Sequence, residues 1–298
     1  MILITGATGF LGSNLTKKLL KDGYSIRIYD TNVTDAKKHF PKAEIMEGDI
    51  MNRSLLKAAM KNVSTVIHLA GLVSYTAPES ELFRINVYGT KNVIDSAVNA
   101  KRVLFASSVS VMGRVDQMVN ENYIGKPVNP YGRSKLVAEN LIRDSGIDGV
   151  SLRMAPLYGA GSYFWIRAMK TVENGFPVPN VPNLIHLLHV RNAVQAFEKS
   201  LKKGSGIYLV ADADPIKFTD FTGIIAKAFG MKQRLWPPWI VFSLAKLKGI
   251  GKELEAFTIP RQYDISKARK ELGYKPNQDT EKEIMSMIDW YKEISVKV

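Results

Sequence analysis

The sequence predicts an α/β fold with a doubly wound parallel sheet, followed by a smaller mixed C-terminal lobe. Three observations predict it. The chain opens on an apolar run that leads into a glycine turn. Strand and helix patterns then alternate to about residue 155, and glycine and proline interrupt this rhythm after Tyr158. We therefore expect one domain at 1–155 and a second lobe at 156–298, partly interleaved with the first.

The first element is the apolar run 1–4, typical of a strand buried on both faces of a parallel sheet. Gly6, Gly9 and Gly12 follow, and apolar residues recur at helical spacing from Phe10 onward. A strand, a glycine turn and a helix in this order place backbone N–H groups and the positive end of a helix against a diphosphate. Gly6 would allow the tight turn, Gly9 would let the pyrophosphate approach, and Gly12 would let the helix pack closely.

The second strand, 24–29, ends at Asp30. An acid at this place accepts hydrogen bonds from the ribose hydroxyls of an adenosine and repels a 2′-phosphate, so it favours NAD over NADP. Arg27 should point to the opposite face, because side chains alternate along a strand.

The remaining elements follow the same rhythm. Asn52 is typical of a helix N-cap. We expect further strands at 43–47, 64–69, 102–107 and 149–154, with helices at 52–60, 78–98 and 131–144. In the second half we expect short strands near 185–188 and 207–210, helices at 190–201 and 219–229, and a mostly helical tail from residue 236.

Composition excludes several classes of protein. The formal net charge is +13, but the basic residues are scattered, which indicates a solvated surface that favours phosphate-bearing ligands rather than nucleic acid. The chain has no cysteine, so it has no disulfide framework, thiol nucleophile or cysteine metal site, and we expect no metal. No apolar run is long enough to span a membrane, and the first strand leaves no room for a signal peptide. A cytoplasmic location is the expectation.

Tyr131 and Lys135 are four residues apart and share a face of a predicted helix that Pro130 would start. At ~4 Å and an effective dielectric of ~20, the lysine ammonium would favour the phenolate by about 4 kcal/mol. Tyr131 could then exchange a proton with a substrate hydroxyl while hydride moves to or from the cofactor. Ser107 and Ser108 end the fifth strand, where a hydroxyl could orient the substrate oxygen. A surface tyrosine beside a solvated lysine is the structural alternative.

These motifs together resemble a known family, the extended short-chain dehydrogenases/reductases of the NAD-dependent epimerase/dehydratase group. The resemblance covers nearly the whole chain and implies a Rossmann-type fold that binds NAD. It rests on the glycine turn, Asp30, and the segments 48–50, 68–71, 86–90, 107–108, 131–135, 153–159, 189–190 and 264–268.

The resemblance also implies the site residues. The catalytic set would be Ser108, Tyr131 and Lys135, with Ser108 preferred over Ser107 because of its distance from Gly113. Asp49 and Ile50 would contact the adenine, and Asn86 would hold the chain near the nicotinamide. The implied cofactor site consists of Gly6, Gly9, Phe10, Leu11, Gly12, Asp30, Asp49, Ile50, Leu69, Ala70, Gly71, Asn86, Tyr131, Lys135 and Pro156.

Three functions remain open within this resemblance. The main hypothesis is NAD-linked oxidation of a secondary alcohol, or the reverse reduction of a ketone. The alternative is a nucleotide-sugar 4-epimerase, similar to UDP-glucose 4-epimerase, that keeps its NAD bound. A third is a regulatory protein that binds NAD without turnover. Val109 and Ser110 replace the acidic pair of the sugar dehydratases, so we exclude dehydration.

Other residues bear on the substrate. Ala155 replaces the asparagine with which the epimerases usually hold it. The segment 190–192 resembles the hydroxysteroid dehydrogenase and dihydroflavonol reductase branch, which often has an asparagine where epimerases have an aspartate. The apolar stretch 236–244 could form one wall of an apolar pocket. Four cations would instead suit a diphosphate: Arg153, Arg167, Lys170 and Arg261. The resemblance also implies a homodimer, in which helices near 83–97 and 131–143 pair with their copies.

Overall fold

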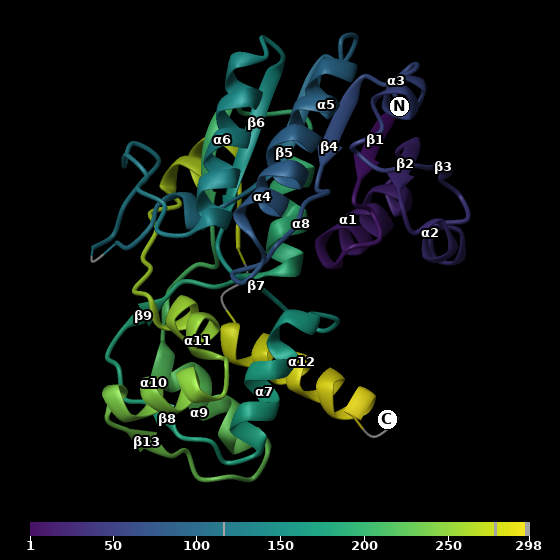
Figure 1. Cartoon of the computed structure of the whole chain (residues 1–298). Helices are drawn as coiled ribbons and strands as arrows, with labels where there is room; N and C mark the ends of the chain where they lie inside the picture. Colours follow the sequence, from purple (N-terminus) through teal and green to yellow (C-terminus); the bar gives the residue numbers. More distant parts are fainter. Residues whose placement is uncertain (116, 277–278, 296–298) are drawn as a thin grey trace.

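The computed structural model describes residues 1–115, 117–276 and 279–295. A seven-stranded parallel sheet forms the upper part of the molecule in Figure 1, and a smaller lobe lies below it. The strand order is β3-β2-β1-β4-β5-β6-β11. Their bounds are β1 Ile2–Thr5, β2 Ile26–Asp30, β3 Glu44–Glu47, β4 Thr65–His68, β5 Arg102–Ser108, β6 Asp148–Met154 and β11 Gly206–Val210.

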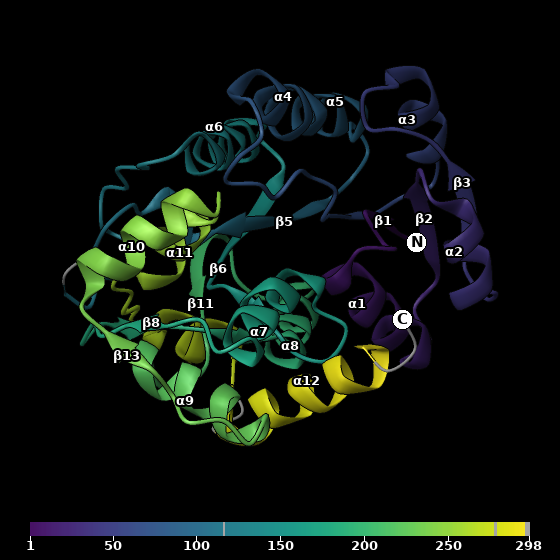
Figure 2. The same cartoon turned by 60° about the horizontal axis from the view of Figure 1, so that its bottom comes forward.

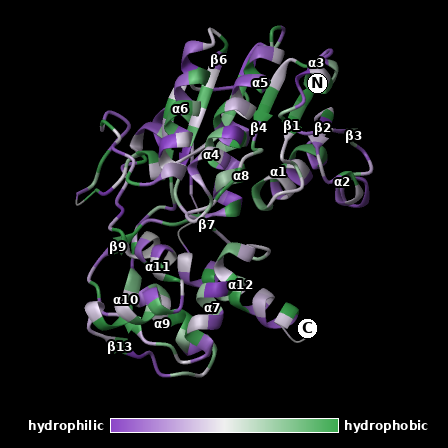
Figure 3. Ribbon diagram, in the orientation of Figure 1, coloured by the Kyte–Doolittle hydropathy of each residue, from purple (hydrophilic) through white to green (hydrophobic). Residues whose placement is uncertain are grey.

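The predicted doubly wound fold is confirmed. The strands carry mostly hydrophobic residues (Figure 3), and in the central strand β1 every residue is buried. In register, Ile4 of β1 lies beside Ile28 of β2 and Ile67 of β4. Helices cover both faces of the sheet (Figure 2). One face carries α3 Arg53–Ala59, α4 Glu79–Phe83, α5 Gly89–Ser96 and α6 Pro130–Asp144, and the other carries α1 Phe10–Lys21 and α8 Val190–Ser200. Helix α2, Val33–His39, lies near the β3 edge.

One local feature differs from the expected elements. The single helix expected at 78–98 is interrupted by a π-helical turn, Arg84–Tyr88, between α4 and α5. The short strand expected near 207–210 is β11, which pairs with β6 and extends the main sheet. Helix α8 likewise packs against α1. The chain therefore returns to the sheet after residue 155, and the helix–sheet core includes residues from both halves of the sequence.

The lobe has a separate hydrophobic core around Trp165, Phe221 and Met287. Between the two parts, β7 Leu157–Tyr158 pairs with β10 Leu188–His189. The helices of the lobe are α7 Ile166–Glu173, α9 Phe218–Ala228, α10 Pro238–Leu247, α11 Gly251–Thr258 and α12 Thr280–Ser295. Its short strands are β8 Val178–Pro179, β9 Leu184–Ile185, β12 Ile216–Lys217 and β13 Leu235–Trp236. The lobe lies toward the carboxyl ends of the sheet strands, where open α/β sheets bind ligands.

Candidate active site

The glycine turn between β1 and α1 is shaped by close backbone contacts. Gly6 has φ +71°, and a Cβ there would lie 2.7 Å from the backbone nitrogen of Ala70. A Cβ on Gly12 would lie 2.0 Å from the carbonyl oxygen of Gly6, so α1 packs directly on the turn. A Cβ on Gly9 would meet only that same oxygen, at 3.4 Å. The fold itself therefore requires Gly6 and Gly12, whereas the protein leaves room beside Gly9, where a diphosphate would approach.

Phe10 and Leu11 begin α1 directly after this turn. Leu11 is buried in the core, and the Phe10 ring lies 3.6 Å from where a Cβ on Gly161 would be, so the start of α1 contacts the loop after β7. Pro156, after β6, is half-buried, and its carbonyl oxygen accepts a hydrogen bond from the Leu188 N–H at 3.0 Å.

The carboxylate of Asp30 lies beside the glycine turn. Its Oδ2 accepts hydrogen bonds from the backbone N–H and the hydroxyl of Thr8, at 3.0 and 3.1 Å, and its Oδ1 accepts one from the Asn32 N–H at 3.1 Å. Arg27 points to the other face, as predicted, and its guanidinium donates to the carbonyl oxygens of Ala59 and Lys61. The structure thus holds the Asp30 carboxylate beside the glycine turn, whereas Arg27 is part of the packing.

Asp49 and Ile50 follow β3 but contribute differently. The carbonyl oxygen of Asp49 accepts a hydrogen bond from the Tyr29 hydroxyl at 2.9 Å, while its side chain is exposed. The side chain of Ile50 is buried, and a Cβ on Gly89 would lie 2.5 Å from its Cδ1. Ile50 therefore anchors this loop on α5, and Asp49 is the more accessible of the two.

Asn86 lies in the π-helical turn and uses its whole amide within the protein. Its Oδ1 accepts from the Leu72 N–H at 2.7 Å, and its Nδ2 donates to the Leu72 carbonyl and to Ser134 Oγ, both at 3.0 Å. Ser134 Oγ in turn donates to the Tyr131 carbonyl at 2.8 Å. Asn86 therefore joins the loop after β4, which contains Leu69, Ala70 and Gly71, to the first turn of α6. Such π-helical turns are frequent at functional sites.

The two serines that end β5 point to different environments. Ser107 is buried and donates a hydrogen bond to Glu139, which forms a buried ion pair with Arg153 at 2.8 Å. Ser108 is half-buried, accepts from the Ser110 N–H at 3.1 Å, and forms a side-chain hydrogen bond with Tyr131. The structure thus brings Ser108, and not Ser107, to the tyrosine.

Tyr131 and Lys135 both lie on α6, whose start is fixed by Pro130 and by the side chain of Asn129, which accepts from the Gly132 N–H at 2.7 Å. Both side chains are buried. The Lys135 ammonium lies 4.3 Å from the centroid of the Phe105 ring, and burial lowers its pKa to about 8. Lys135 Nζ lies 3.9 Å from the position that a Cβ on Gly71 would take. This amine is therefore next to the loop that follows β4.

The expected lowering of the phenol pKa does not occur in this structure. Burial raises the pKa of Tyr131 above its usual value of 10; the nearby Tyr75 adds to this, and the hydrogen bond with Ser108 opposes it. Burial removes water from the phenolate, and this desolvation is the largest cause of the raised pKa. The positive charge of an oxidised nicotinamide would favour ionisation of the phenol.

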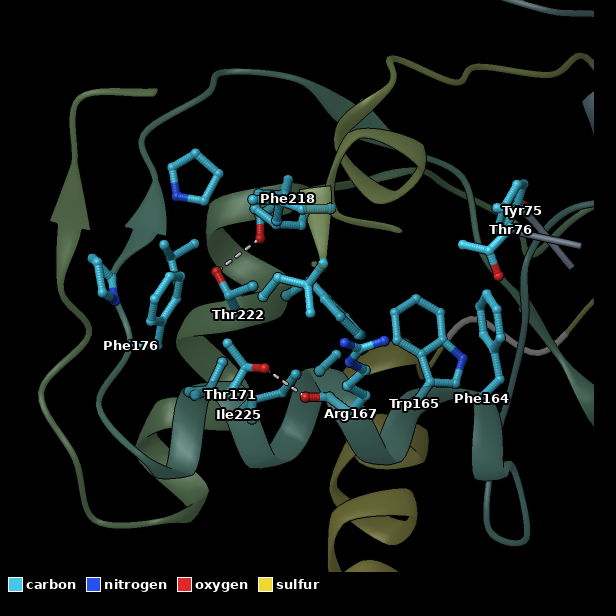
Figure 4. Close-up of a pocket in the computed structure, with 18 of the residues that line it drawn as sticks. Tyr75, Thr76, Phe164, Trp165, Arg167, Thr171, Phe176, Phe218, Thr222 and Ile225 are labelled. Carbon is cyan, nitrogen blue, oxygen red and sulfur yellow. Dashed lines mark hydrogen bonds between the residues drawn. The ribbon is translucent and has the colours of Figure 1, made fainter. Parts of the chain in front are cut away.

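A cavity of about 290 Å³ opens in the lobe. Its walls come from the loop after β4, the segment 164–179, α9 and the α10–α11 region, and they are mainly apolar and aromatic (Figure 4). Tyr75 belongs to this lining, and its ring lies edge-on to that of Tyr131, with 6.0 Å between centroids. Sequence reasoning missed Tyr75, because an isolated tyrosine in a loop carries no spacing signal.

The structure corrects two expectations about the substrate. Arg153, on β6, is held in a buried ion pair by Glu139 and is not placed for a diphosphate. Arg167 is the one of these four cations that lines the cavity, as far as the described residues show. Lys170 is exposed, and Arg261 is buried. The apolar stretch 236–244 does not line the cavity as described; its wall on that side is formed by Ile250 and Leu254.

The described part of the chain contains no cluster of three or more histidine, cysteine, aspartate or glutamate side chains arranged to hold a metal ion. Within the same residues, no helix is both long enough and apolar enough to cross a bilayer.

Known proteins resemble this chain over most of its length. Residues 2–211 match the model of the NAD dependent epimerase/dehydratase family. A 3 beta-hydroxysteroid dehydrogenase/Delta 5-->4-isomerase of Mycobacterium tuberculosis is 25% identical, covering 97% of this chain and 90% of the relative. A UDP-glucose 4-epimerase of Vibrio cholerae is 28% identical, covering 93% and 91%.

A solved structure shows the same fold. The UDP-glucuronic acid 4-epimerase of Bacillus cereus, in complex with NAD, superposes with a TM-score of 0.81 at 20% identity, covering 98% of this chain and 99% of that one. The matched family model, the relatives and this fold agree with the hydride-transfer chemistry that the sequence predicts. The chain belongs to the NAD-dependent epimerase/dehydratase family, and it is an NAD-dependent enzyme of the extended short-chain dehydrogenase/reductase type, whose members here include dehydrogenases and epimerases.

Proposed function

We propose that this protein is a dehydrogenase that oxidises a secondary hydroxyl on a largely apolar molecule, or reduces the corresponding ketone. One observation carries the proposal: the apolar cavity shares Tyr75 with the surroundings of Tyr131. A substrate in this cavity would reach the tyrosine at the Tyr75 end. An apolar lining with few polar groups binds an apolar ligand and orients it through those groups.

The residues take the following roles. Tyr131 accepts the proton of the substrate hydroxyl, and Ser108 holds the substrate oxygen by a hydrogen bond. Below its lowered pKa of about 8, Lys135 is positively charged. This charge stabilises the phenolate of Tyr131 once the tyrosine has ionised. Gly9 and Asp30 would hold the diphosphate and the ribose of NAD, which supplies the hydride acceptor when bound. Asn86 positions the loop and the helix around them.

The test is release of NADH, followed at 340 nm, with a panel of apolar secondary alcohols. We expect turnover with at least one of them and a fall in kcat of about 10³ in Tyr131→Phe, which keeps the ring but removes the proton acceptor. Tyr24→Phe is the matched control, because this half-buried tyrosine lies before β2 at the other edge of the sheet. Equal activity of Tyr131→Phe and the parent would contradict the proposal.

The second candidate is a nucleotide-sugar 4-epimerase. It is favoured by the similarity to the epimerase of Vibrio cholerae and by Arg167, which brings one positive charge to the cavity wall. An epimerase would interconvert UDP-glucose and UDP-galactose without net release of NADH. This outcome, with no oxidation of the apolar alcohols, would favour the second candidate over the first.

A homodimer remains part of the proposal. Helices α4, α5 and α6 lie side by side on one face of the sheet. Tyr88, in the π-helical turn between α4 and α5, and Val137, on α6, are exposed. Pairing of these helices with their copies would cover these side chains. Light scattering at micromolar concentration should give the dimer mass, and a monomer would contradict this part.

A cytoplasmic location stays a prediction from the absence of cysteine.

A further inference from the structure

Helix α10 presents an apolar face to water. Trp239 and Leu247 are 72% and 85% exposed, while Val241 and Ala245 are buried. Residues eight apart are separated by about two turns and lie near the same face, with Ser243 between them. Figures 1 and 2 both place α10 at the outer rim of the lobe. Single exposed hydrophobic residues are normal, but a tryptophan and a leucine on one face of a helix with an apolar sequence indicate an interaction surface.

The charge on this helix and its turn into α11 is positive, and the acidic residues Glu253 and Glu255 follow on α11. Residues 221–252 contain six lysines and arginines and no acidic residue. Lys246, Lys248 and Lys252, on α10 and at the start of α11, are exposed. Protein interfaces are depleted in lysine, whereas helices that lie in a membrane surface combine tryptophan and leucine with lysine. The charge and the apolar face therefore match an anionic lipid surface better than a protein partner.

The same region contributes to the substrate cavity. Ile250, in the turn after α10, and Leu254 of α11 belong to its lining. The Lys248 ammonium lies 4.7 Å from the ring centroid of Phe176, another lining residue. Figure 4 shows Phe176 at the opposite end of the cavity from Tyr75. The cavity thus extends from the surroundings of α10 to the ring that contacts Tyr131.

We propose that α10 and its turn into α11 dock the protein on an anionic lipid surface, from which the cavity takes its substrate. A helix of ten residues is about 15 Å long, so it would lie in the interface and not span it. Docking depends only on the apolar, basic surface of α10. The uptake of a membrane-dissolved substrate also rests on the proposed dehydrogenase function.

The first test is co-sedimentation of the full chain with lipid vesicles. We expect binding to vesicles of phosphatidylcholine with 30% phosphatidylglycerol, weakened by salt, and much weaker binding to phosphatidylcholine alone. Binding should shift the tryptophan emission to the blue, and Trp239→Phe should lose most of this shift, although Trp165, Trp236 and Trp290 remain. Failure to bind anionic vesicles overturns the proposal.

Paired variants test which surface is used. Trp239→Ser with Leu247→Ser should lower the vesicle partition coefficient by about tenfold or more, because the inserted apolar area is lost. Lys246→Gln with Lys248→Gln should lower it by about fivefold for each lysine. The matched controls are Ile124→Ser, for an exposed apolar residue, and Lys37→Gln with Lys38→Gln on α2, and these should bind as the parent does. Equal losses in variants and controls would overturn the proposal.

Two further measurements separate the alternatives. If the parent self-associates without lipid and Trp239→Ser with Leu247→Ser abolishes this, the face binds a second copy and the proposal fails. Tyr131→Phe should bind anionic vesicles like the parent, because the catalytic tyrosine is buried away from α10. Loss of NADH release therefore does not imply loss of docking, and the two proposals can fail independently.

Discussion

The adjacent serines at the end of β5 offer a sharp test of the site, because they differ in environment and not in chemistry. In Ser107→Ala the buried carboxylate of Glu139 loses one donor but keeps three hydrogen bonds from Arg153, at 2.8 to 3.2 Å. A hydrogen bond to a buried charge contributes about 1.5–3 kcal/mol. We therefore expect the free energy of unfolding to fall by about that amount, with kcat within twofold of the parent.

Ser108→Ala should show the opposite pattern. Ser108 is half-buried and its hydroxyl contacts Tyr131, so its loss removes a hydrogen bond at the reacting oxygen. Removing one such donor typically lowers kcat by about 10²–10³, or ~2.7–4 kcal/mol of transition-state stabilisation. The stability should change by less than about 1 kcal/mol. Urea unfolding followed by circular dichroism measures the stability, and initial rates of NADH formation measure kcat.

Two outcomes would contradict these assignments of the two serines. If Ser107→Ala loses activity while its unfolding midpoint is unchanged, the catalytic hydroxyl has been assigned to the wrong serine. If both variants lose stability and neither loses kcat, the hydrogen bond between Ser108 and Tyr131 has no role in the reaction.

Three other changes follow from the geometry. Gly9→Ala should fold like the parent but bind NAD at least about tenfold more weakly in fluorescence titrations, whereas Gly12→Ala should fold poorly, because its Cβ would lie 2.0 Å from a carbonyl oxygen. Asp30→Asn should lower the preference for NAD over NADP at least about tenfold, measured as the ratio of kcat/KM values, because the repulsion of a 2′-phosphate is lost. Lys135 has a folded-state pKa of about 8, below its unfolded value of 10.5, so the unfolded chain binds more protons between these values and stability should rise with pH across this window. Urea unfolding without NAD should show a rise of up to about 3 kcal/mol relative to Lys135→Met; parallel pH profiles would refute it.

Much of the fold could be predicted from the sequence because its signals are local. The apolar run before Gly6, the N-cap at Asn52 and the proline that starts α6 each act within a few residues, and the structure has a strand or a helix at each. The sequence predicted a strand near 207–210 and an interleaved lobe, but it could not predict that β11 pairs with β6, because a five-residue strand does not encode its partner. The break in the helix at 84–88 was also missed, since its cause is the packing of Asn86 against a distant loop and α6.

By itself, the sequence determined the family, the cofactor and the chemistry, because glycine spacing, the acid after β2 and a tyrosine and lysine four residues apart are short-range patterns. The tertiary structure alone decided that Ser107 and Arg153 serve an internal network around Glu139 and that Tyr75 joins the cavity to Tyr131. Each of these depends on residues far apart in the chain whose distances are set by packing. The same packing left the apolar face of α10 exposed to water.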